Sequence, residues 1–318
     1  MTSQQRDKIH SPSSREEDNS QEAEGPNALI IFDSNSATIQ KFKPESDDWD
    51  TTDNGFSEDM KKWGFSAAVL DKALLIFMNN KAVYRYQRKK SIISWHRLPD
   101  MTTIHGQRPP AVVLNDTMYA IGSAGVGLHT NKGEKYSVSR RKWMLIENMV
   151  VARRNHSIVA TEGSIYCLGG QNEKGTLLSV EAFDATTKHW SKVADLPEPR
   201  HSAAAVASGS DIFVMGGFVN GKRRHDMICI SIPSALCITL AHMNMTRTTF
   251  SSFIIDGKIF AVGGDNSCPN LHRRFIFVLR PSISDFLLQA PPVSVFVIHY
   301  IFILTSAARC LHCNNTCV

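Results

Sequence analysis

The sequence predicts an all-β fold made of repeated four-stranded antiparallel sheets. Within Arg153–Leu196, short apolar or alternating runs are separated by Gly-Gly, Asp-Ala and Thr-Thr-Lys turns, a pattern typical of antiparallel strands. The same segment recurs along the chain, and repetition at a fixed period indicates a repeat architecture. The period is regular, because Gly122, Gly169, Gly216 and Gly263 follow one another at steps of 47 residues.

Two further sets of residues keep this step of 47 to within one residue. The repeated arginines are Arg153, Arg200 and Arg247. The repeated tryptophans are Trp49, Trp95, Trp143 and Trp190, and one further step of 47 residues reaches Cys237. A single four-stranded sheet cannot bury both faces alone, and a ring of stacked sheets protects its edges. We therefore predict a β-propeller.

The propeller is expected to have about six blades, with the last one incomplete. The predicted blades are 27–52 (partial), 63–101, 106–149, 153–196, 200–243 and 247–280 (partial). The predicted structural glycines are Gly122, Gly169, Gly170, Gly216, Gly217, Gly263 and Gly264. A glycine pair lets the chain leave the second strand where neighbouring blades crowd it. Asn79-Asn80 replaces the pair in the second blade, and asparagine tolerates positive φ better than other non-glycine residues.

Tryptophan is expected to act as a wedge between blades. Burying about 200 Å² of its surface is worth at most roughly 5 kcal/mol. Cys237 therefore predicts a weaker seam.

These features together resemble the kelch repeat over roughly residues 27–265. The most specific stretches are `IYCLGG`, `VEAFDATTKHW` and `LPEPRHS`. The repeats are similar to those of the kelch-like proteins. This resemblance implies a six-bladed propeller, which in that family follows BTB and BACK domains. That propeller recruits substrates to a cullin-type ubiquitin ligase. The 26 residues before the first blade are too few for a BTB fold of about 100 residues. We therefore expect that this chain does not bind a cullin by itself.

In the family's usual arrangement, the C-terminus returns to complete the first blade. Leu29–Trp49 fits strands two to four of that blade, and Arg273–Arg280 is the expected third strand of the sixth. Residues 281–318 differ in composition, and we favour a non-homologous ending from alternative splicing or read-through. The alternatives are a genuine closing strand and membrane association. The apolar run Val293–Leu304 is shorter than the roughly 20 residues of a membrane-spanning helix.

Composition restricts the function classes. Residues 1–26 are polar and have little to bury, so they are expected to be a disordered tail. The net charge of +5 is too mild for a nucleic-acid binder. Met1 is not followed by an apolar segment, and the seven cysteines show no disulfide framework. We expect a cytoplasmic protein with no nucleic-acid or membrane partner.

Neither a catalytic nor a cofactor site is predicted. Gly122–His129 is glycine-rich but has no strand–helix context for a dinucleotide. No G-x-S-x-G segment organises a serine nucleophile. Cys310, His312, Cys313 and Cys317 have Cys-x2-Cys spacing at the C-terminus, but a zinc site needs four ligands on a folded support. We therefore predict no metal, and a propeller enzyme is the minor alternative.

A basic rim is the candidate binding site. In an up-and-down blade, the loops joining strands two to three and four to one emerge on the same face. The predicted rim residues are Arg108, Arg153, Arg154, Lys174, Arg200, Lys222, Arg223, Arg224 and Arg247. Guanidinium groups suit carboxylates through bidentate pairing, and the resemblance implies partner peptides on this rim. For the repeated arginines the alternative is a structural role.

The sequence thus predicts a non-catalytic protein-interaction module whose partners carry acidic motifs. The alternatives are an actin-associated kelch scaffold and a truncated isoform without independent activity.

Overall fold

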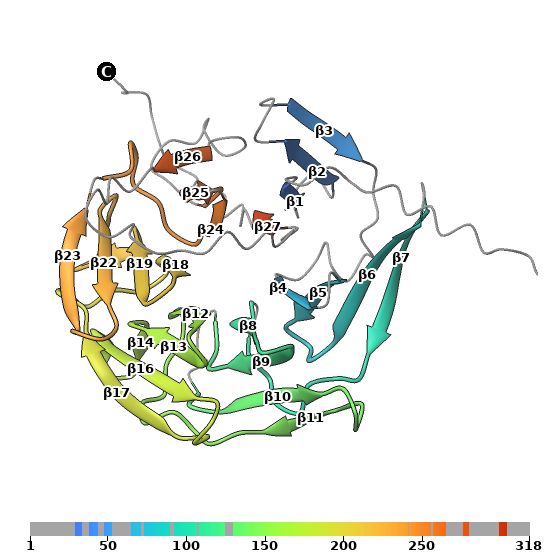
Figure 1. Ribbon diagram of the computed structural model, residues 1–318, viewed down its shortest axis with the longest axis horizontal. Coiled ribbons are helices and arrows are strands. Elements are labelled where there is room, and N and C mark those ends of the chain that lie inside the picture. The colour runs from blue at the N-terminus through green and yellow to red at the C-terminus, as the bar shows by residue number, and fades with distance from the viewer. Residues whose placement is uncertain are drawn as a thin grey trace, which may run out of the picture.

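The computed structural model describes residues 29–33, 38–43, 48–52, 65–70, 73–89, 92–106, 108–124, 130–240, 242–255, 257–264, 276–279 and 299–303. Every element in these ranges is a strand, and the strands form six sheets of three or four strands. Figure 1 shows the sheets following one another around a ring. The all-β propeller prediction is confirmed.

The first three blades begin the ring. Blade 1 contains β1 (Leu29–Asp33), β2 (Thr38–Lys43), β3 (Asp48–Thr52) and β27 (His299–Ile303). Blade 2 contains β4 (Phe65–Leu70), β5 (Ala73–Met78), β6 (Val83–Lys89) and β7 (Ile92–Leu98). Blade 3 contains β8 (Ala111–Leu114), β9 (Thr117–Ile121), β10 (Gly133–Ser137) and β11 (Lys142–Leu145).

The next three blades continue it. Blade 4 contains β12 (Ser157–Thr161), β13 (Ser164–Leu168), β16 (Ser179–Asp184) and β17 (Trp190–Asp195). Blade 5 contains β18 (Ala204–Ser208), β19 (Asp211–Met215), β22 (Met227–Ser231) and β23 (Leu236–Leu240). Blade 6 contains β24 (Ser251–Ile255), β25 (Lys258–Val262) and β26 (Ile276–Leu279). Two short hairpins project from blades 4 and 5: β14 (Gln171–Asn172) with β15 (Gly175–Thr176), and β20 (Phe218–Val219) with β21 (Lys222–Arg223).

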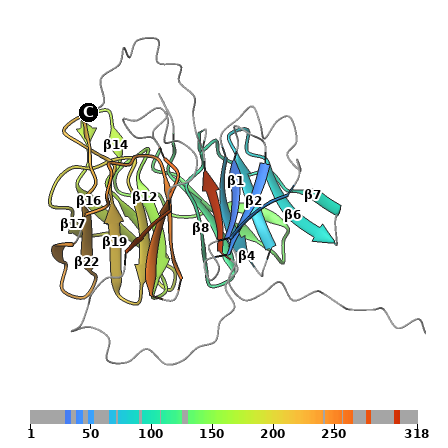
Figure 2. The same cartoon turned by 90° about the horizontal axis from the view of Figure 1, so that it is seen from above.

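The ring is joined at its centre by the innermost strands. β4, β8, β12, β18, β24 and β27 each contact the next, so β27 lies between β24 and β4. Figure 2 shows the same strands from the side, with loops at both ends. His299–Ile303 therefore occupies the closing position in the ring, whereas the origin of residues 281–318 is still a prediction. β27 pairs parallel to β1, whereas the innermost strands of the other five blades pair antiparallel.

The glycine pairs stand where neighbouring blades meet. Gly169 and Gly170 have φ values of 59° and 97°, which side chains rarely adopt. A Cβ on Gly169 would lie 2.2 Å from the carbonyl oxygen of Arg200, so the predicted crowding is confirmed. A turn stands at Asn79-Asn80, as predicted, but the positive φ falls on Lys81 (71°) and on neither asparagine.

The seams between blades are filled mainly by apolar side chains, and tryptophan marks two of them. The indole N–H of Trp143 donates to the carbonyl of Pro99 (3.0 Å), and that of Trp190 donates to the carbonyl of Glu147 (2.9 Å). Each carbonyl belongs to the preceding blade or its exit segment. Trp95 packs at 5.1 Å from Tyr86 within blade 2, and the side chain of Trp49 lies outside the described residues.

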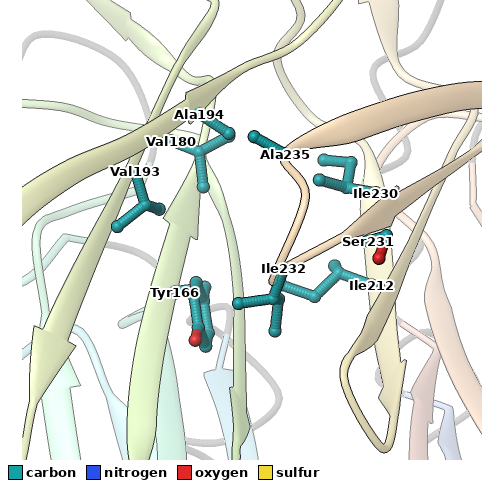
Figure 3. A pocket seen from close by; sticks show the side chains of 9 residues that line it. All are labelled: Tyr166, Val180, Val193, Ala194, Ile212, Ile230, Ser231, Ile232 and Ala235. Atoms are coloured by element: carbon teal, nitrogen blue, oxygen red, sulfur yellow. The ribbon is translucent and has the colours of Figure 1, made fainter.

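Cys237 occupies the equivalent place in blade 5. Its thiol is 3.6 Å from the carbonyl of Asp195, the position that an indole N–H fills in the two preceding seams. A small apolar hollow lies in the same seam between blades 4 and 5, lined by residues that include Tyr166, Val193 and Ile230 (Figure 3). The prediction of a weaker seam is consistent with this hollow.

Candidate interaction surface

The repeated arginines are buried at the edge of the propeller. Arg153, Arg200 and Arg247 are 0%, 1% and 3% exposed. Each donates through Nη1 to the carbonyl of the first glycine of its own blade, at 2.8, 2.6 and 2.6 Å. Buried side chains cannot contact a partner at the surface, so the partner-binding prediction for these three arginines is corrected. The structural alternative is the one that the geometry supports.

Two of these arginines also pair with a carboxylate from the third strand. Arg153 pairs with Glu181, which accepts backbone N–H groups of Val150 (2.7 Å) and Val151 (3.1 Å). Arg200 makes a bidentate pair with Asp226, at 2.9 and 2.6 Å. Burial alone would raise the pKa of Asp226, but the hydrogen bond and charge of Arg200 lower it below its usual value. The pairs tie the segment entering each blade to its third strand.

In blade 3 a histidine takes the arginine's place. His105 contacts the carbonyl of Gly122 through Nδ1 (2.6 Å) and Glu134 through Nε2 (2.9 Å), with both side chains fully buried. Arg108, which was predicted for the rim, lies three residues further on and is half-buried, and binding by it is still a prediction. Glu134 and Glu181 are 47 residues apart, so the carboxylates were a readable repeat marker that sequence reasoning missed.

The two sets of rim loops lie at the same end of the blades, as expected, and backbone hydrogen bonds join them. Arg154 and Gln171 exchange backbone hydrogen bonds (2.9 and 2.8 Å), and so do His201 and Phe218 (3.2 and 2.8 Å). These contacts bring the segments that enter blades 4 and 5 beside the hairpins β14–β15 and β20–β21. Lys174 and Lys222 are exposed on the hairpins, and Arg154 is half-buried. Binding by these residues is still a prediction.

An aromatic stack stands among the basic residues of blade 5. The rings of His201 and Phe218 stack with centroids 5.0 Å apart, and the Arg223 guanidinium lies 5.4 Å from the Phe218 centroid. Burial, and then the charge of Arg154, lower the pKa of His201. Sequence reasoning missed His201 and Phe218, because the predicted rim consisted of lysines and arginines alone.

Arg224 has acidic neighbours on the same rim. Its guanidinium lies 3.1 Å from Glu198 and 3.6 Å from Asp226, so part of its charge is already balanced. Together the exposed and half-buried residues form a basic rim patch, which consists of Arg154, His201, Phe218, Lys222, Arg223 and Arg224.

The described residues give little support for a metal site, a membrane-spanning helix or a reactive cysteine. No group of three or more metal-ligating side chains occurs there, and no helix there is long and apolar enough to cross a membrane. Cys167, Cys229 and Cys237 are unbridged. Burial raises the pKa of Cys167 to about 12 and that of Cys229 to about 11, so these thiols are poor nucleophiles. The C-terminal Cys-x2-Cys segment lies outside the described residues.

Comparison with known families agrees with the repeat geometry. The family model described as "KLHDC2/KLHL20/DRC7 Kelch-repeats domain" matches residues 94–282, which is more than half of the chain. The chain belongs to the kelch-repeat family. The match includes all of blades 3 to 5 and the three described strands β24–β26 of blade 6.

Individual relatives cover smaller parts. The chain is 31% identical over 156 residues to beta-scruin of Limulus polyphemus, covering 46% of this chain and 17% of that protein. It is 24% identical over 143 residues to Kelch-like protein 36 of Rattus norvegicus, covering 44% and 23%. The match therefore spans less than a quarter of either relative. The solved structure "Structure of YjhT" is similar in fold, with a TM-score of 0.55 and 17% identity over 64% of this chain and 72% of that chain.

Proposed function

We propose that this kelch propeller is a non-catalytic protein-binding module that takes acidic segments on the basic rim patch. The observation that carries the proposal is the gathering of three cationic side chains around an aromatic stack. Lys222, Arg223 and Arg154 lie on segments that interlock at one edge of blades 4 and 5. Phe218 supplies an aromatic ring that contacts His201 and Arg223.

The chemistry of the patch suits carboxylates near an apolar or aromatic residue. Arginine presents a planar fork that pairs bidentately with carboxylate oxygens, and the phenyl face beside it favours a further ring or aliphatic group. An incoming carboxylate would compete with Glu198 for Arg224. Exposed charges are screened by salt, so binding is expected to weaken as ionic strength rises.

A peptide-display selection tests the proposal. The full chain is screened against a random library, beside the variant Lys222→Glu/Arg223→Glu and the control Arg140→Glu/Lys142→Glu. The control residues are exposed at the β10–β11 connection, which lies at the opposite end of a blade from the rim. We expect wild type and control to enrich acidic peptides and the rim variant to lose them. Equal enrichment by all three chains would exclude the patch.

The finer role that we propose is substrate recognition for a cullin-type ubiquitin ligase, in keeping with the kelch-like proteins among the relatives. It requires that a protein bound through the patch becomes ubiquitinated in cells in a manner that depends on Lys222 and Arg223. Co-sedimentation with filamentous actin that the rim variant loses, without such ubiquitination, would favour the actin-associated scaffold instead.

A further inference from the structure

The short hairpin of blade 5 ends in an Asn-Gly turn. Asn220 and Gly221 join β20 to β21 and have φ values of 50° and 72°. Positive φ at both central residues is typical of the two-residue turn that favours Asn-Gly. The equivalent hairpin of blade 4 has Glu173 and Lys174 at its tip, 47 residues earlier, and neither has a positive φ. The repeat therefore does not require Asn-Gly at this place.

The two turn residues are open to solvent. Both are exposed, and a Cβ built on Gly221 would meet nothing within 4 Å. Within the described part of the chain, neither the side-chain amide of Asn220 nor the N–H of Gly221 is hydrogen-bonded. The hairpin consists of two residue pairs. Because a two-stranded hairpin is marginally stable, its tip can open while the blade stays folded.

An asparagine followed by glycine holds a nucleophile beside an electrophile. The backbone nitrogen of Gly221 can attack the side-chain carbonyl carbon of Asn220, because glycine has no side chain to shield that nitrogen. A nitrogen–carbon bond forms, the bond to the side-chain nitrogen breaks, and that nitrogen leaves as ammonia with the proton of the backbone amide. Water then opens the five-membered imide at either carbonyl, which yields aspartate or isoaspartate. The reaction consumes water and needs no oxidant.

We propose that Asn220 is a modification site at which this reaction places a negative charge in the basic rim patch. The new carboxylate stands two residues before Lys222 and three before Arg223, on the hairpin that carries both. It offsets part of the positive charge that attracts an acidic segment, and isoaspartate also lengthens the backbone of the turn by a methylene group. The modification itself is independent of the proposed function, whereas its effect on acidic segments rests on that function.

Mass spectrometry of the full chain tests the chemistry. The folded protein is incubated at mildly alkaline pH and digested with trypsin beside an unincubated sample. The tryptic peptide His201–Lys222 contains Asn220 as its sole asparagine and no glutamine, so conversion of an amide to an acid on it identifies the site. The chain's other Asn-Gly pair, Asn54-Gly55, falls in a different tryptic peptide and outside the described residues.

The control peptide comes from the same digest. Asn155–Lys174 contains two asparagines, which are followed by histidine and glutamate. We expect His201–Lys222 to convert faster than this control and to give two products, aspartyl and isoaspartyl, that chromatography separates. Conversion of His201–Lys222 no faster than that of the control overturns the proposal.

Calorimetric titration with a selected acidic peptide tests the consequence for binding. Asn220→Asp should bind about two- to fivefold more weakly than wild type at low salt. The neutral control Asn220→Gly suits the same turn and should keep the wild-type affinity. Equal affinity of all three chains overturns the effect on the patch. A wild type that binds no acidic peptide refutes the proposed function, and the conversion of His201–Lys222 still decides whether Asn220 is a modification site.

Discussion

Replacing Arg200 by methionine should be among the most destabilising single changes in this propeller. The guanidinium is 1% exposed and makes three hydrogen bonds, one to the Gly216 carbonyl and two to Asp226. Arg200→Met leaves the Asp226 carboxylate buried, with Arg224 as the nearest cation at 3.6 Å. Removing one partner of a buried pair costs about 3–5 kcal/mol. We expect a loss of that size in the free energy of unfolding.

A double-mutant cycle separates the pair from the rest of the site. Arg200→Met/Asp226→Leu removes both charges, so the remaining loss should reflect mainly the unpaired Gly216 carbonyl, about 1–3 kcal/mol. The two single losses should therefore exceed the double loss by at least 1 kcal/mol.

The assay is urea unfolding followed by tryptophan fluorescence, with Arg97→Met as the control. Arg97 pairs with Asp100 on the surface, and its loss should cost at most about 1 kcal/mol. A loss for Arg200→Met no larger than that of the control, or additivity in the cycle, would refute the reasoning.

Three further predictions use the same measurements. Trp190→Ala should cost about 3–5 kcal/mol, whereas Cys237→Ala should cost under about 1.5 kcal/mol; equal losses would remove the contrast between the two seams. Burial alone would raise the pKa of Glu134, but hydrogen bonds from His105 and from Thr102–Thr103 lower it below 4.5. The ionised Glu134 carboxylate therefore stabilises the fold fully above about pH 5, and this stabilisation is lost as pH falls through the pKa of Glu134 in the folded state. Glu134→Gln should make the free energy of unfolding depend less on pH below about pH 5. An unchanged pH dependence would contradict this. Gly169→Ala should lower the free energy of unfolding by about 2–5 kcal/mol, because the new Cβ clashes with backbone and the residue has a positive φ. Gly209→Ala should lower it by about 1–2 kcal/mol, because φ is positive but the Cβ meets open space. Identical losses would argue against crowding at Gly169.

The repeat made the architecture predictable from sequence. A step of 47 residues in Gly122, Gly169 and Gly216 places one blade after another whatever the individual strands prefer. The placement of the two loop sets at the same end also followed, because in an antiparallel blade alternate connections emerge at the same end. The parallel pairing of β27 with β1 did not follow, since an apolar segment in the tail carries no repeat marker that sets its direction.

The candidate site was predicted less well, and burial is the reason. Arg153 and Arg154 are neighbours in sequence, yet one is buried and the other half-buried. Charge at a repeat position cannot tell whether a side chain points into the blade or toward the rim. The 47-residue spacing of Glu134 and Glu181 could have predicted the buried pairs. A carboxylate that recurs with the same period as an arginine indicates that the two residues pair within each blade. In blade 3 the partner of the carboxylate is His105, which the search for arginine overlooked.

The central claim is that acidic segments bind the basic rim patch, and calorimetric titration of one selected acidic peptide tests it most directly. Wild type is measured at two salt concentrations beside Lys222→Glu/Arg223→Glu and Arg140→Glu/Lys142→Glu. We predict that affinity falls with salt in wild type and in the opposite-face control, and that the rim variant loses binding while it keeps its unfolding midpoint. Undiminished binding by the folded rim variant would contradict the claim.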